Sequence, residues 1–546
     1  MKLLEPWEAI EVVYSFVGRS VAERVLLDSD VVDITDLYGR LIAEPVKAVI
    51  PQPPTPRSTL DGYAVSVADL IGASKSSPVK LRISGYSRIG DSRVQELEPG
   101  GCIQVDTGSI IPRGADAVVP VEDVVVDGGY AVFTHTPEPG SGLALPASDV
   151  STGDVIVPRG ARGYPEVVAA LASQGYRRVK ASRRVRVAIL STGDELLEPG
   201  TPYRVGGVFE SNRFYLSAIM RSLGYEVVDL GIVADDPHVV EEALFKAATL
   251  ADIVVTSGGT SVGVKDYIYK VLEARGRMLV RGLRVKPGKP TIVGLLGETL
   301  IVGISGNPRA AVNITWSFLI PLLDRLGLPA YLREPVVKDV VLALPVKLDK
   351  RRRLSLPLAV VETRGETLGF PVAVESYMIA SLPKADSKAE LERGEVAQAG
   401  SIVKALNYRY PEPTLIALTD TRLIDLGALN VRVVTSIVEN AEQVISRLRG
   451  SNVKLLVSST QLGSLEDIGI VEWRAKREIV LVGRSTCRKT AVFKPYSSMY
   501  KAGITTERAE TASILVEQGY VDCAVIPEDY RREELEVVEV IGVEEV

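Results

Sequence analysis

The feature that most constrains this chain is a regular alternation of strand-like and helix-like segments between residues 185 and 326. Three near-continuous apolar runs are typical of buried strands: VRVAIL, YEVVDLGIV and ADIVVT. Between the runs, apolar residues recur with helical spacing, as in Leu216, Ile219, Met220 and Leu223. Apolar strands that alternate with amphipathic helices predict a parallel sheet covered on both faces. We therefore expect a central α/β domain.

Polar, glycine-rich sequence follows each of these three predicted strands. The three stretches are STGDE, ADDP and SGGTSVGVKDY. Open parallel sheets bind ligands beyond the carboxyl ends of their strands. Glycines let backbone amides approach a ligand, and a loop that leads into a helix presents unpaired N–H groups to an anion. The loop residues expected to contact a phosphate-bearing ligand are Ser191, Thr192, Gly193, Asp235, Asp236, Ser257, Gly258, Gly259 and Ser261.

Three carboxylates at these strand ends, Asp194, Glu195 and Asp266, fit a magnesium ion. Mg²⁺ takes a few carboxylates together with phosphate oxygens of a ligand. Each loop by itself could equally be a helix N-cap or a tight turn. Three such loops at adjacent strand ends are harder to explain by capping, so we predict a site for Mg²⁺ and phosphate.

A further stretch, RVKPGKPT, places Lys286 and Lys289 on a turn that Pro287 and Pro290 hold stiff. A rigid turn with two ammonium groups suits a small oxyanion, because little side-chain entropy is lost on binding. Alone, the stretch would more often be a solvated β-turn. The stretch GISGNPRAA ends a strand and puts Pro308 at the first helical position, which gives another helix start that can receive an anion.

Short valine-rich runs between residues 63 and 140 predict a β-rich module. Asp61 precedes Gly62 just before this module, where an Asp-Gly hairpin turn is an equal alternative. Thr107 lies in a second hydroxyl-rich turn, DTGS, and Asp149 lies in SDVSTGD. Asp149 could equally be an ordinary surface acid.

Composition excludes several classes of protein. With only two histidines, His135 and His238, histidine-based metal or triad chemistry is nearly excluded. The three cysteines, Cys102, Cys487 and Cys523, have no paired spacing, which argues against a disulfide framework and favours an intracellular, cytoplasmic protein. The net charge of −6 argues against general nucleic-acid binding. We expect no membrane span and no secretory peptide, because the apolar runs are short and the start is charged.

Taken in order, these elements resemble the molybdopterin molybdenumtransferase family, which includes MoeA and the E domain of gephyrin. The matching stretches, between residue 1 and about 406, are STLDGYAV, DTGSIIPRGADAVV, SDVSTGD, STGDEL, ESNR, GIVADDP, SGGTSVGVKDY, VKPGKP and GNP. The resemblance implies a homodimer whose site forms between the α/β domain of one subunit and the first domains of the other. It implies an elongated domain I (1–48 and 143–183), an inserted β-rich domain II (49–142), a molybdopterin-binding α/β domain III (184–329) and a β-barrel domain IV (330–406).

The resemblance also implies a reaction, the insertion of molybdate or tungstate into adenylylated molybdopterin with release of AMP. Asp61, Glu195 and Asp266 would be catalytic, and Mg²⁺ would be the cofactor, held by Asp194, Glu195 and Asp266. The implied substrate-binding residues are Thr107, Asp149, Ser191, Thr192, Gly193, Asn212, Asp235, Asp236, Ser257, Gly258, Gly259, Ser261, Lys286, Pro287, Lys289, Pro290 and Arg309.

Three positions depart from the family pattern, and one segment lies outside it. Ser305 stands where the family usually has Pro, and Arg309 and Ala310 stand where it has a small residue followed by Ser. We hypothesise that Arg309 substitutes as an anion ligand. Residues 407–546 continue the β/α alternation, and LVGRSTCRKT resembles part of a periplasmic-binding-protein-like domain. A structural or dimer-supporting extension is an equal alternative.

Two other functions fit parts of the sequence. Molybdopterin adenylyltransferases share the α/β domain and are compatible with SGGTS, but STLDGYAV and VKPGKP argue against them. A non-catalytic oxyanion sensor or scaffold would use the extension. The acidic set Asp61, Asp194, Glu195 and Asp266 favours catalysis, because a scaffold has no need of Mg²⁺ ligands.

Overall fold

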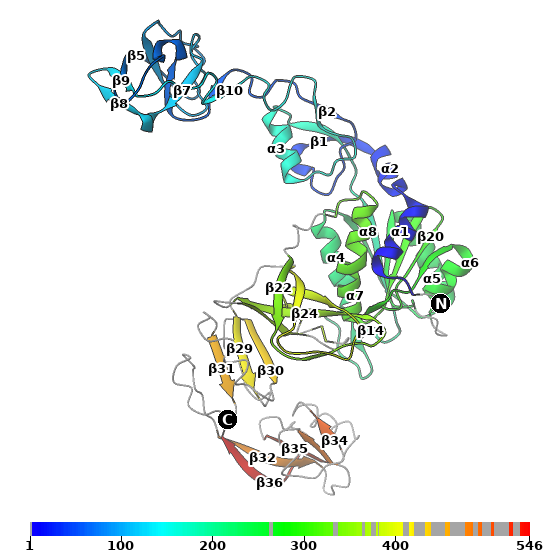
Figure 1. Ribbon diagram of the computed structural model, residues 1–546. Coiled ribbons are helices and arrows are strands. Elements are labelled where there is room, and N and C mark those ends of the chain that lie inside the picture. The colour runs from blue at the N-terminus through cyan, green and yellow to red at the C-terminus, as the bar shows by residue number, and fades with distance from the viewer. Residues whose placement is uncertain are drawn as a thin grey trace.

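The molecule is elongated, with a β-rich module at the end of an arm, an α/β domain in the middle and a β-barrel beyond it (Figure 1). This arrangement is seen in a computed structural model, in which the described residues are 3–260, 266–330, 337–362, 366–372, 378–379 and 382–407. Beyond residue 407, only the backbone of individual strands is described. Within these described parts, no helix has both the length and the apolar character needed to cross a membrane.

A six-stranded sheet forms the centre of the α/β domain. In spatial order its strands are β16 (Glu226–Val233), β13 (Arg186–Thr192), β17 (Ile253–Ser257), β21 (Thr299–Ile304), β20 (Ile292–Leu296) and β18 (Arg277–Arg281). The first four strands run parallel, as the apolar sequence of three of them predicts.

The parallel arrangement does not extend to the β20 edge of the sheet. β20 runs antiparallel to β21, and β18 runs antiparallel to β20. Only Gly297 and Glu298 separate β20 from β21. Such a short connection can join antiparallel strands only, because parallel strands need a crossover of a dozen or more residues. As a result, Ile292 at the start of β20 pairs with Gly303 near the carboxyl end of β21.

Helices cover both faces of this sheet. Val187 and Ile189 of β13 pack on one side, and Ala188 and Leu190 pack on the other, because successive residues of a strand point to opposite faces. The first side is covered by α1 (Pro6–Val17), α2 (Ser20–Leu27), α4 (Asn212–Ser222), α7 (Pro308–Ile314), a π-helical turn (Thr315–Leu319) and α8 (Ile320–Arg325). The second side is covered by α5 (Pro237–Leu250) and α6 (Tyr267–Arg275).

The arm is built from two separate chain segments that pair with each other. β1 (Ser29–Asp33) pairs antiparallel with β12 (Arg178–Ser182), and β2 (Val46–Lys47) pairs with β11 (Val155–Val157). Helix α3 (Pro165–Ser173) closes a small apolar core around Leu171. The segment that leads out to the inserted module and the segment that returns from it therefore lie side by side in the arm. The domain boundaries expected from the resemblance stay predictions.

The inserted module at the end of the arm is a six-stranded sheet, in keeping with its valine-rich sequence. In spatial order its strands are β7 (Ala117–Pro120), β4 (Gly62–Val65), β6 (Gly101–Val105), β5 (Val79–Ser87), β9 (Tyr130–Phe133) and β8 (Val124–Asp127). The short pair β3 (Arg57–Ser58) and β10 (Leu143–Ala144) connects the module to the arm.

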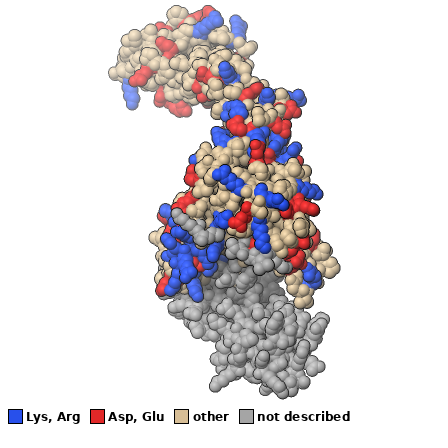
Figure 2. All heavy atoms as spheres, turned by 90° about the vertical axis from the view of Figure 1, so that its right-hand side faces the viewer, with Lys and Arg blue, Asp and Glu red and all other residues tan. Residues whose placement is uncertain are grey.

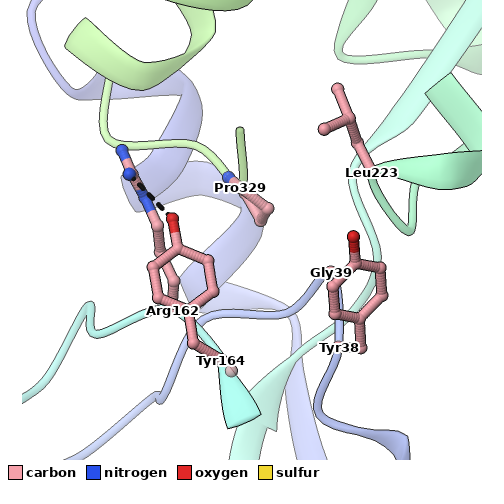
Figure 3. A pocket seen from close by; sticks show the side chains of 7 residues that line it. Tyr38, Gly39, Arg162, Tyr164, Leu223 and Pro329 are labelled. Atoms are coloured by element: carbon pink, nitrogen blue, oxygen red, sulfur yellow. Dashed lines mark hydrogen bonds between the residues drawn. The ribbon is translucent and has the colours of Figure 1, made fainter. Parts of the chain in front are cut away.

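The arm meets the α/β domain at the amino edge of the central sheet, where α4 ends and β16 begins. Arg162 of the arm donates to the side chain of Asp324 at 2.5 Å and to its carbonyl oxygen at 2.8 Å. Figure 3 shows Arg162 also reaching the hydroxyl of Tyr164, at 3.0 Å. This joint surrounds a small hollow lined by Tyr38, Gly39, Arg162, Gly163, Tyr164, Leu223 and Pro329. The hollow lies at the edge opposite the loops that were expected to bind a ligand.

The third folded unit is a small barrel, as predicted. β24 pairs with β25 on one side and with β26 on the other, which closes the sheet on itself. Around the barrel its strands are β24 (Arg353–Glu362), β25 (Thr367–Pro371), β22 (Val337–Leu342), β28 (Ile402–Asn407) and β26 (Ser387–Leu391). A short pair, β23 (Val346–Lys347) and β27 (Val396–Ala397), lies outside it.

Beyond the barrel, the described backbone contains two further sheets. A parallel three-stranded sheet consists of β30 (Arg432–Ile437), β29 (Thr414–Thr419) and β31 (Lys454–Ser458). The second sheet consists of β34 (Ile504–Thr506), β33 (Thr490–Phe493), β35 (Cys523–Pro527), β32 (Lys476–Gly483) and β36 (Glu536–Glu545). Most of the stretch LVGRSTCRKT lies outside the described residues, so its resemblance to a periplasmic-binding-protein-like domain stays a prediction.

Candidate functional site

Backbone hydrogen bonds tie together the loops at the carboxyl edge of the central sheet. The N–H of Gly258, which follows β17, donates to the carbonyl of Ile304 at the end of β21, at 2.9 Å. The N–H of Gly193, which follows β13, donates to the carbonyl of Val233 at the end of β16, at 3.4 Å. Two pairs of neighbouring strand ends, β17 with β21 and β13 with β16, are thus linked, and the loops predicted to bind a ligand follow them.

The glycines after β17 are required by contacts within the protein. Gly258 and Gly259 have φ angles of +92° and +63°, which L side chains rarely adopt. A Cβ on Gly258 would lie 2.5 Å from the carbonyl oxygen of Thr192, and one on Gly259 would lie 2.8 Å from Ile268 Cγ1. The loop can therefore follow its course close to β13 and α6 only with glycine at both positions. Ser261, the next predicted ligand residue of this loop, lies outside the described residues.

Asn212, the first residue of α4, links two of these loops. Its Nδ2 donates to Ser257 Oγ at 2.8 Å and to the carbonyl oxygen of Gly306 at 2.9 Å. Both Asn212 and Ser257 are buried. The amide thereby fixes the loop after β17 against the loop before α7, which is a positioning role for a predicted substrate-binding residue.

Several buried hydroxyl groups at the ends of β13 and β17 have no hydrogen-bond partner among the described residues: Ser191 Oγ, Thr192 Oγ1 and Thr256 Oγ1. A buried polar group without a partner costs about 1–3 kcal/mol, and it is normally met by water or a ligand. By strand alternation, Ser191 faces the α4 side of the sheet, whereas Thr192 and Thr256 face the α6 side. Unmet hydroxyls on both faces of one sheet edge are consistent with a polar ligand at that edge.

The predicted carboxylates have different local roles. Asp236 caps α5, since its Oδ1 accepts from the N–H groups of His238 at 2.9 Å and Val239 at 3.1 Å. For Asp236, the capping alternative is therefore correct. Asp266 precedes α6 but makes no capping hydrogen bond with its side chain. His238 takes part in this cap through its backbone N–H, which donates to Asp236.

Asp194 and Glu195 lie on the turn that leaves β13. Asp194 Oδ1 accepts from the N–H of Asp235 at 3.0 Å, which ties the first two strand-end loops together. The carboxylate of Glu195 folds back over Gly193, and its oxygens lie 2.8 Å from where a Cβ on that glycine would stand. A side chain at Gly193 would displace the Glu195 carboxylate.

No three side chains of Asp, Glu, His or Cys within the described residues are grouped as a complete metal site. In phosphate sites, Mg²⁺ commonly takes one or two carboxylates, with phosphate and water oxygens completing its shell. The exposed pair Asp194 and Glu195, with Asp266 half-buried at the start of α6, offers ligands of the right kind. The donor chemistry therefore fits Mg²⁺ together with a phosphorylated ligand.

The two-lysine turn lies at this same edge, because the antiparallel β20 begins there. Asn313 of α7 donates to the carbonyl of Pro287 at 2.7 Å. Gly288 has a φ of +121°, and a Cβ there would lie 2.5 Å from Ile314 Cδ1. The Pro-Gly centre of the turn is thus packed on α7, while Lys286 and Lys289 on either side are exposed. Pro290 is half-buried and completes the turn.

Arg309 is directed toward the barrel. Its side chain is 3% exposed, and Nη2 donates to the carbonyl oxygen of Ser355 on β24 at 2.7 Å. Ala310 beside it is buried, and Ser305 Oγ accepts from the N–H of Asn307 at 3.4 Å. The contact ties α7 to the barrel and gives no support to the hypothesis that Arg309 is an anion ligand.

At the far end of the arm, Asp61 and Thr107 are brought together across 46 positions of sequence. Asp61 Oδ1 accepts from the Thr107 N–H at 2.6 Å and from the Thr107 hydroxyl at 2.8 Å. These two hydrogen bonds, the backbone one first, lower the pKa of Asp61 below its ordinary value. Asp149 is exposed in the loop before β11, where its N–H donates to the Gln52 carbonyl.

Within one chain, the module that carries Asp61 stands far from the carboxyl edge of the central sheet (Figure 1). The arm joins the sheet at its amino edge, so the chain itself separates these two groups of residues. Asp61 and Thr107 therefore do not complete the strand-end loops of their own α/β domain.

Arg213, in the stretch ESNR, is a residue whose role was not foreseen. Its guanidinium is buried and pairs with Asp229 of β16 and, at 2.5 Å, with Glu198. Glu198 directly follows β14 (Leu196–Leu197), which pairs in parallel with β15 (Val208–Phe209). Arg213 therefore anchors the segment that follows β14, beside the loop of Asp194 and Glu195. The available signal was an arginine in the first turn of a helix with several acids nearby in sequence.

Known proteins resemble this chain in sequence over both the arm and the α/β domain. Residues 8–175 match the model of the MoeA N-terminal region (domain I and II), and residues 188–325 match the probable molybdopterin binding domain. A molybdopterin molybdenumtransferase of Nostoc sp. is 34% identical over 317 residues, which cover 57% of this chain and 73% of that protein. The chain belongs to the molybdopterin molybdenumtransferase family. The Haemophilus influenzae protein of the same name is 34% identical over 55% of this chain and 73% of its own length.

Solved structures of the family confirm the multidomain fold. Two crystal structures of the molybdopterin biosynthesis MoeA protein of Pyrococcus horikoshii match 75% and 74% of this chain and 100% of their own. Their TM-scores are 0.54 and 0.59, at identities of 30% and 24%. Membership in this family confirms the expected enzyme class, a molybdopterin molybdenumtransferase of molybdenum cofactor biosynthesis.

Proposed function

We propose that this molybdopterin molybdenumtransferase inserts molybdate or tungstate into adenylylated molybdopterin, releases AMP and uses Mg²⁺. The observation that carries the proposal is the convergence, at one edge of the central sheet, of a glycine loop, a carboxylate group and a two-lysine turn. These are the three kinds of groups that a pyrophosphate, its metal ion and a small oxyanion require.

The chain's own residues have separate tasks in this proposal. The Gly258–Gly259 loop and the unmet hydroxyls of Ser191 and Thr192 bind the phosphate or pterin of the substrate. Lys286 and Lys289 bind the oxyanion, whose two negative charges match two ammonium groups.

Mg²⁺, when bound by Asp194, Glu195 or Asp266, lowers the charge cost of breaking the phosphoanhydride bond. Asn212 holds the two loops together, because its side chain donates hydrogen bonds to Ser257 and to Gly306. The substrate phosphates supply the ligands that these carboxylates leave open.

We further propose that the enzyme works as a homodimer in the cytoplasm, with Asp61 and Thr107 of one copy completing the strand-end site of the other. The separation of these residues within one chain supports this arrangement (Figure 1). The lowered pKa of Asp61 supports an ionised carboxylate that serves as a ligand or a base rather than an acid.

The test is a reconstituted assay that follows AMP release from adenylylated molybdopterin with molybdate or tungstate. We expect release to depend on oxyanion and on Mg²⁺, and to fall by about a hundredfold or more in Glu195→Gln. Lys404→Ala is the matched surface control, because Lys404 pairs with Asp339 at 3.1 Å on the barrel. Oxyanion-independent release, or release unchanged in Glu195→Gln, would contradict the proposal.

A further inference from the structure

The two-lysine turn is joined to the barrel as well as to α7. Its first strand, β19 (Val285–Lys286), pairs in parallel with β24, where Lys286 stands opposite Leu354. In the same place, Lys286 Nζ lies 3.5 Å from Oδ2 of Asp349, in the barrel turn between β23 and β24. The lysine side chain is 47% exposed and the aspartate side chain 13%. A solvent-facing ammonium therefore rests against a largely buried carboxylate of another domain.

Asp349 is itself held firmly by its own turn. Its Oδ1 accepts from the backbone N–H groups of Arg351 and Arg352, each at 2.9 Å, and its Oδ2 accepts from Arg352 Nη2 at 2.9 Å. Burial raises the pKa of Asp349, but the hydrogen bonds from Arg352 and Arg351 outweigh it and bring the pKa well below its ordinary value. The carboxylate is thus ionised and fixed in position.

We infer that Asp349 is a positioning residue for the transfer reaction, which holds the ammonium of Lys286 in the orientation that receives the oxyanion. This inference rests on the proposed role of Lys286. A lysine on a flexible stem loses rotamer freedom when it binds an anion, and a fixed counter-charge beside it removes part of that loss beforehand. Asp349 would thereby lower the oxyanion concentration that the enzyme needs.

The charge of Asp349 does not make this surface repel anions. The stretch KLDKRRR around it contains five cations and one acid, and Arg352 neutralises that acid directly. Lys350 pairs with Glu395 and Arg353 with Glu392, so five cations face three acids and a net charge of +2 remains. Lys347, Lys350 and Arg351 of the same turn are exposed. Figure 2 shows Lys and Arg gathered low on the described surface in that view. An incoming dianion therefore meets a positive field, in which Asp349 acts on Lys286 at short range.

The same carboxylate has the opposite role if it competes with the oxyanion for Lys286. The two roles predict opposite signs for the effect of removing its charge. If Asp349 positions Lys286, Asp349→Asn raises the KM for the oxyanion. If Asp349 competes with the oxyanion, the same variant lowers that KM.

The experiment measures the KM for molybdate and kcat in the AMP-release assay with the full chain. We expect Asp349→Asn to raise the KM about fivefold with kcat nearly unchanged, and Asp349→Glu to recover part of the loss. In the double variant with Lys286→Ala, Asp349→Asn should add nothing, because its partner is already gone. Asp339→Asn is the control, since it breaks the Lys404 pair on β22 and β28 of the same barrel.

Three outcomes would overturn the inference: an unchanged KM, a lowered KM, or an equal rise in Asp339→Asn. Thermal unfolding of each variant shows whether a rise in KM comes with loss of the fold, and Asp349→Glu keeps the test valid if Asp349→Asn does not fold. A normal KM in Lys286→Ala would instead contradict the proposed oxyanion turn. The failure of the proposed function can therefore be told apart from the failure of this inference.

Discussion

The amide nitrogen of Asn212 lies 2.8 Å from the hydroxyl of Ser257, and this buried contact joins the start of α4 to the end of β17. The same nitrogen also reaches the Gly306 carbonyl at 2.9 Å, so a single side chain spans two loops of the site. Its loss would leave the buried Ser257 hydroxyl and the partly buried Gly306 carbonyl without this donor at once.

Asn212→Ala should therefore lower both stability and activity. The buried Ser257 hydroxyl without its donor costs about 1–3 kcal/mol. The Gly306 carbonyl costs less, because its bond is only part-buried and water can replace the donor. We expect kcat/KM for adenylylated molybdopterin to fall about tenfold or more, and Asn212→Asp to behave similarly because it lacks the donating NH₂. Chemical denaturation and steady-state kinetics measure the two effects. Full activity in Asn212→Asp would show that the amide donor is dispensable.

Gly258→Ala should destabilise the protein more than the same substitution at a glycine with free space around its Cβ position. The new Cβ would stand 2.5 Å from the Thr192 carbonyl at a φ of +92°, so contact and backbone strain add. Gly72 is the matched control, with a φ of +82° and nothing within 4 Å of its Cβ position. We expect Gly72→Ala to cost about 1 kcal/mol from strain alone and Gly258→Ala about 2–4 kcal/mol, as measured by denaturant unfolding. Equal costs would mean that the loop can move away from β13.

Mixing two variants with reduced activity tests whether the site forms between two copies. In a mixed dimer of Asp61→Asn and Lys286→Ala chains, one site receives both defects and the other receives neither. Random exchange makes half of the dimers mixed, so activity should recover to about a quarter of the wild-type value. AMP release after co-refolding measures this recovery. Absence of recovery, with exchange verified by differently tagged chains, would place both residues in one chain's site.

Thr107→Val should raise the pKa of Asp61 toward its ordinary value of 3.8, because it removes the hydroxyl donor and keeps the backbone donor. Because the pKa of Asp61 is lower in the folded state, its ionised form stabilises the fold at pH values above the ordinary pKa. That stabilisation is lost as the pH falls through the folded-state pKa. The variant should thus lose less stability on acidification. Carboxyl NMR titration, with Asp61→Asn to assign the signal, measures the shift. An unchanged pKa would mean that the backbone N–H alone sets it.

The strand ends of the central sheet could be predicted because their signals are local. Apolar runs, helical spacing and the glycines at 258 and 259 are each readable within a few residues, and β16 ends where the sequence indicated. β13 and β17 continue one or two residues further, so Ser191, Thr192 and Ser257, which were expected in loops, lie at the ends of strands. The β-rich module was likewise expected from short valine-rich runs, and the barrel was expected from the resemblance. The resemblance named the family that the comparisons confirm.

Several features of the site depend on contacts that no short stretch encodes. The capping role of Asp236, the direction of Arg309 toward the barrel and the anchoring of Glu198 by Arg213 are such features. Each depends on which element lies beside the residue, and a stretch such as ADDP reads the same whether its carboxylate caps a helix or meets a ligand. Sequence could nominate these residues, but it could not assign their partners.

By itself, the sequence determined the family, the sheet-and-helix order and the loops that end the parallel strands, because propensity and periodicity act over a few residues. Only the tertiary structure decided that an antiparallel β20 carries the two-lysine turn to the same edge, and that Asp349 of the barrel rests on Lys286. It also decided that the arm holds Asp61 away from its own sheet (Figure 1). The reason is that strand register and domain docking arise from packing between segments far apart in the chain, which local patterns do not specify.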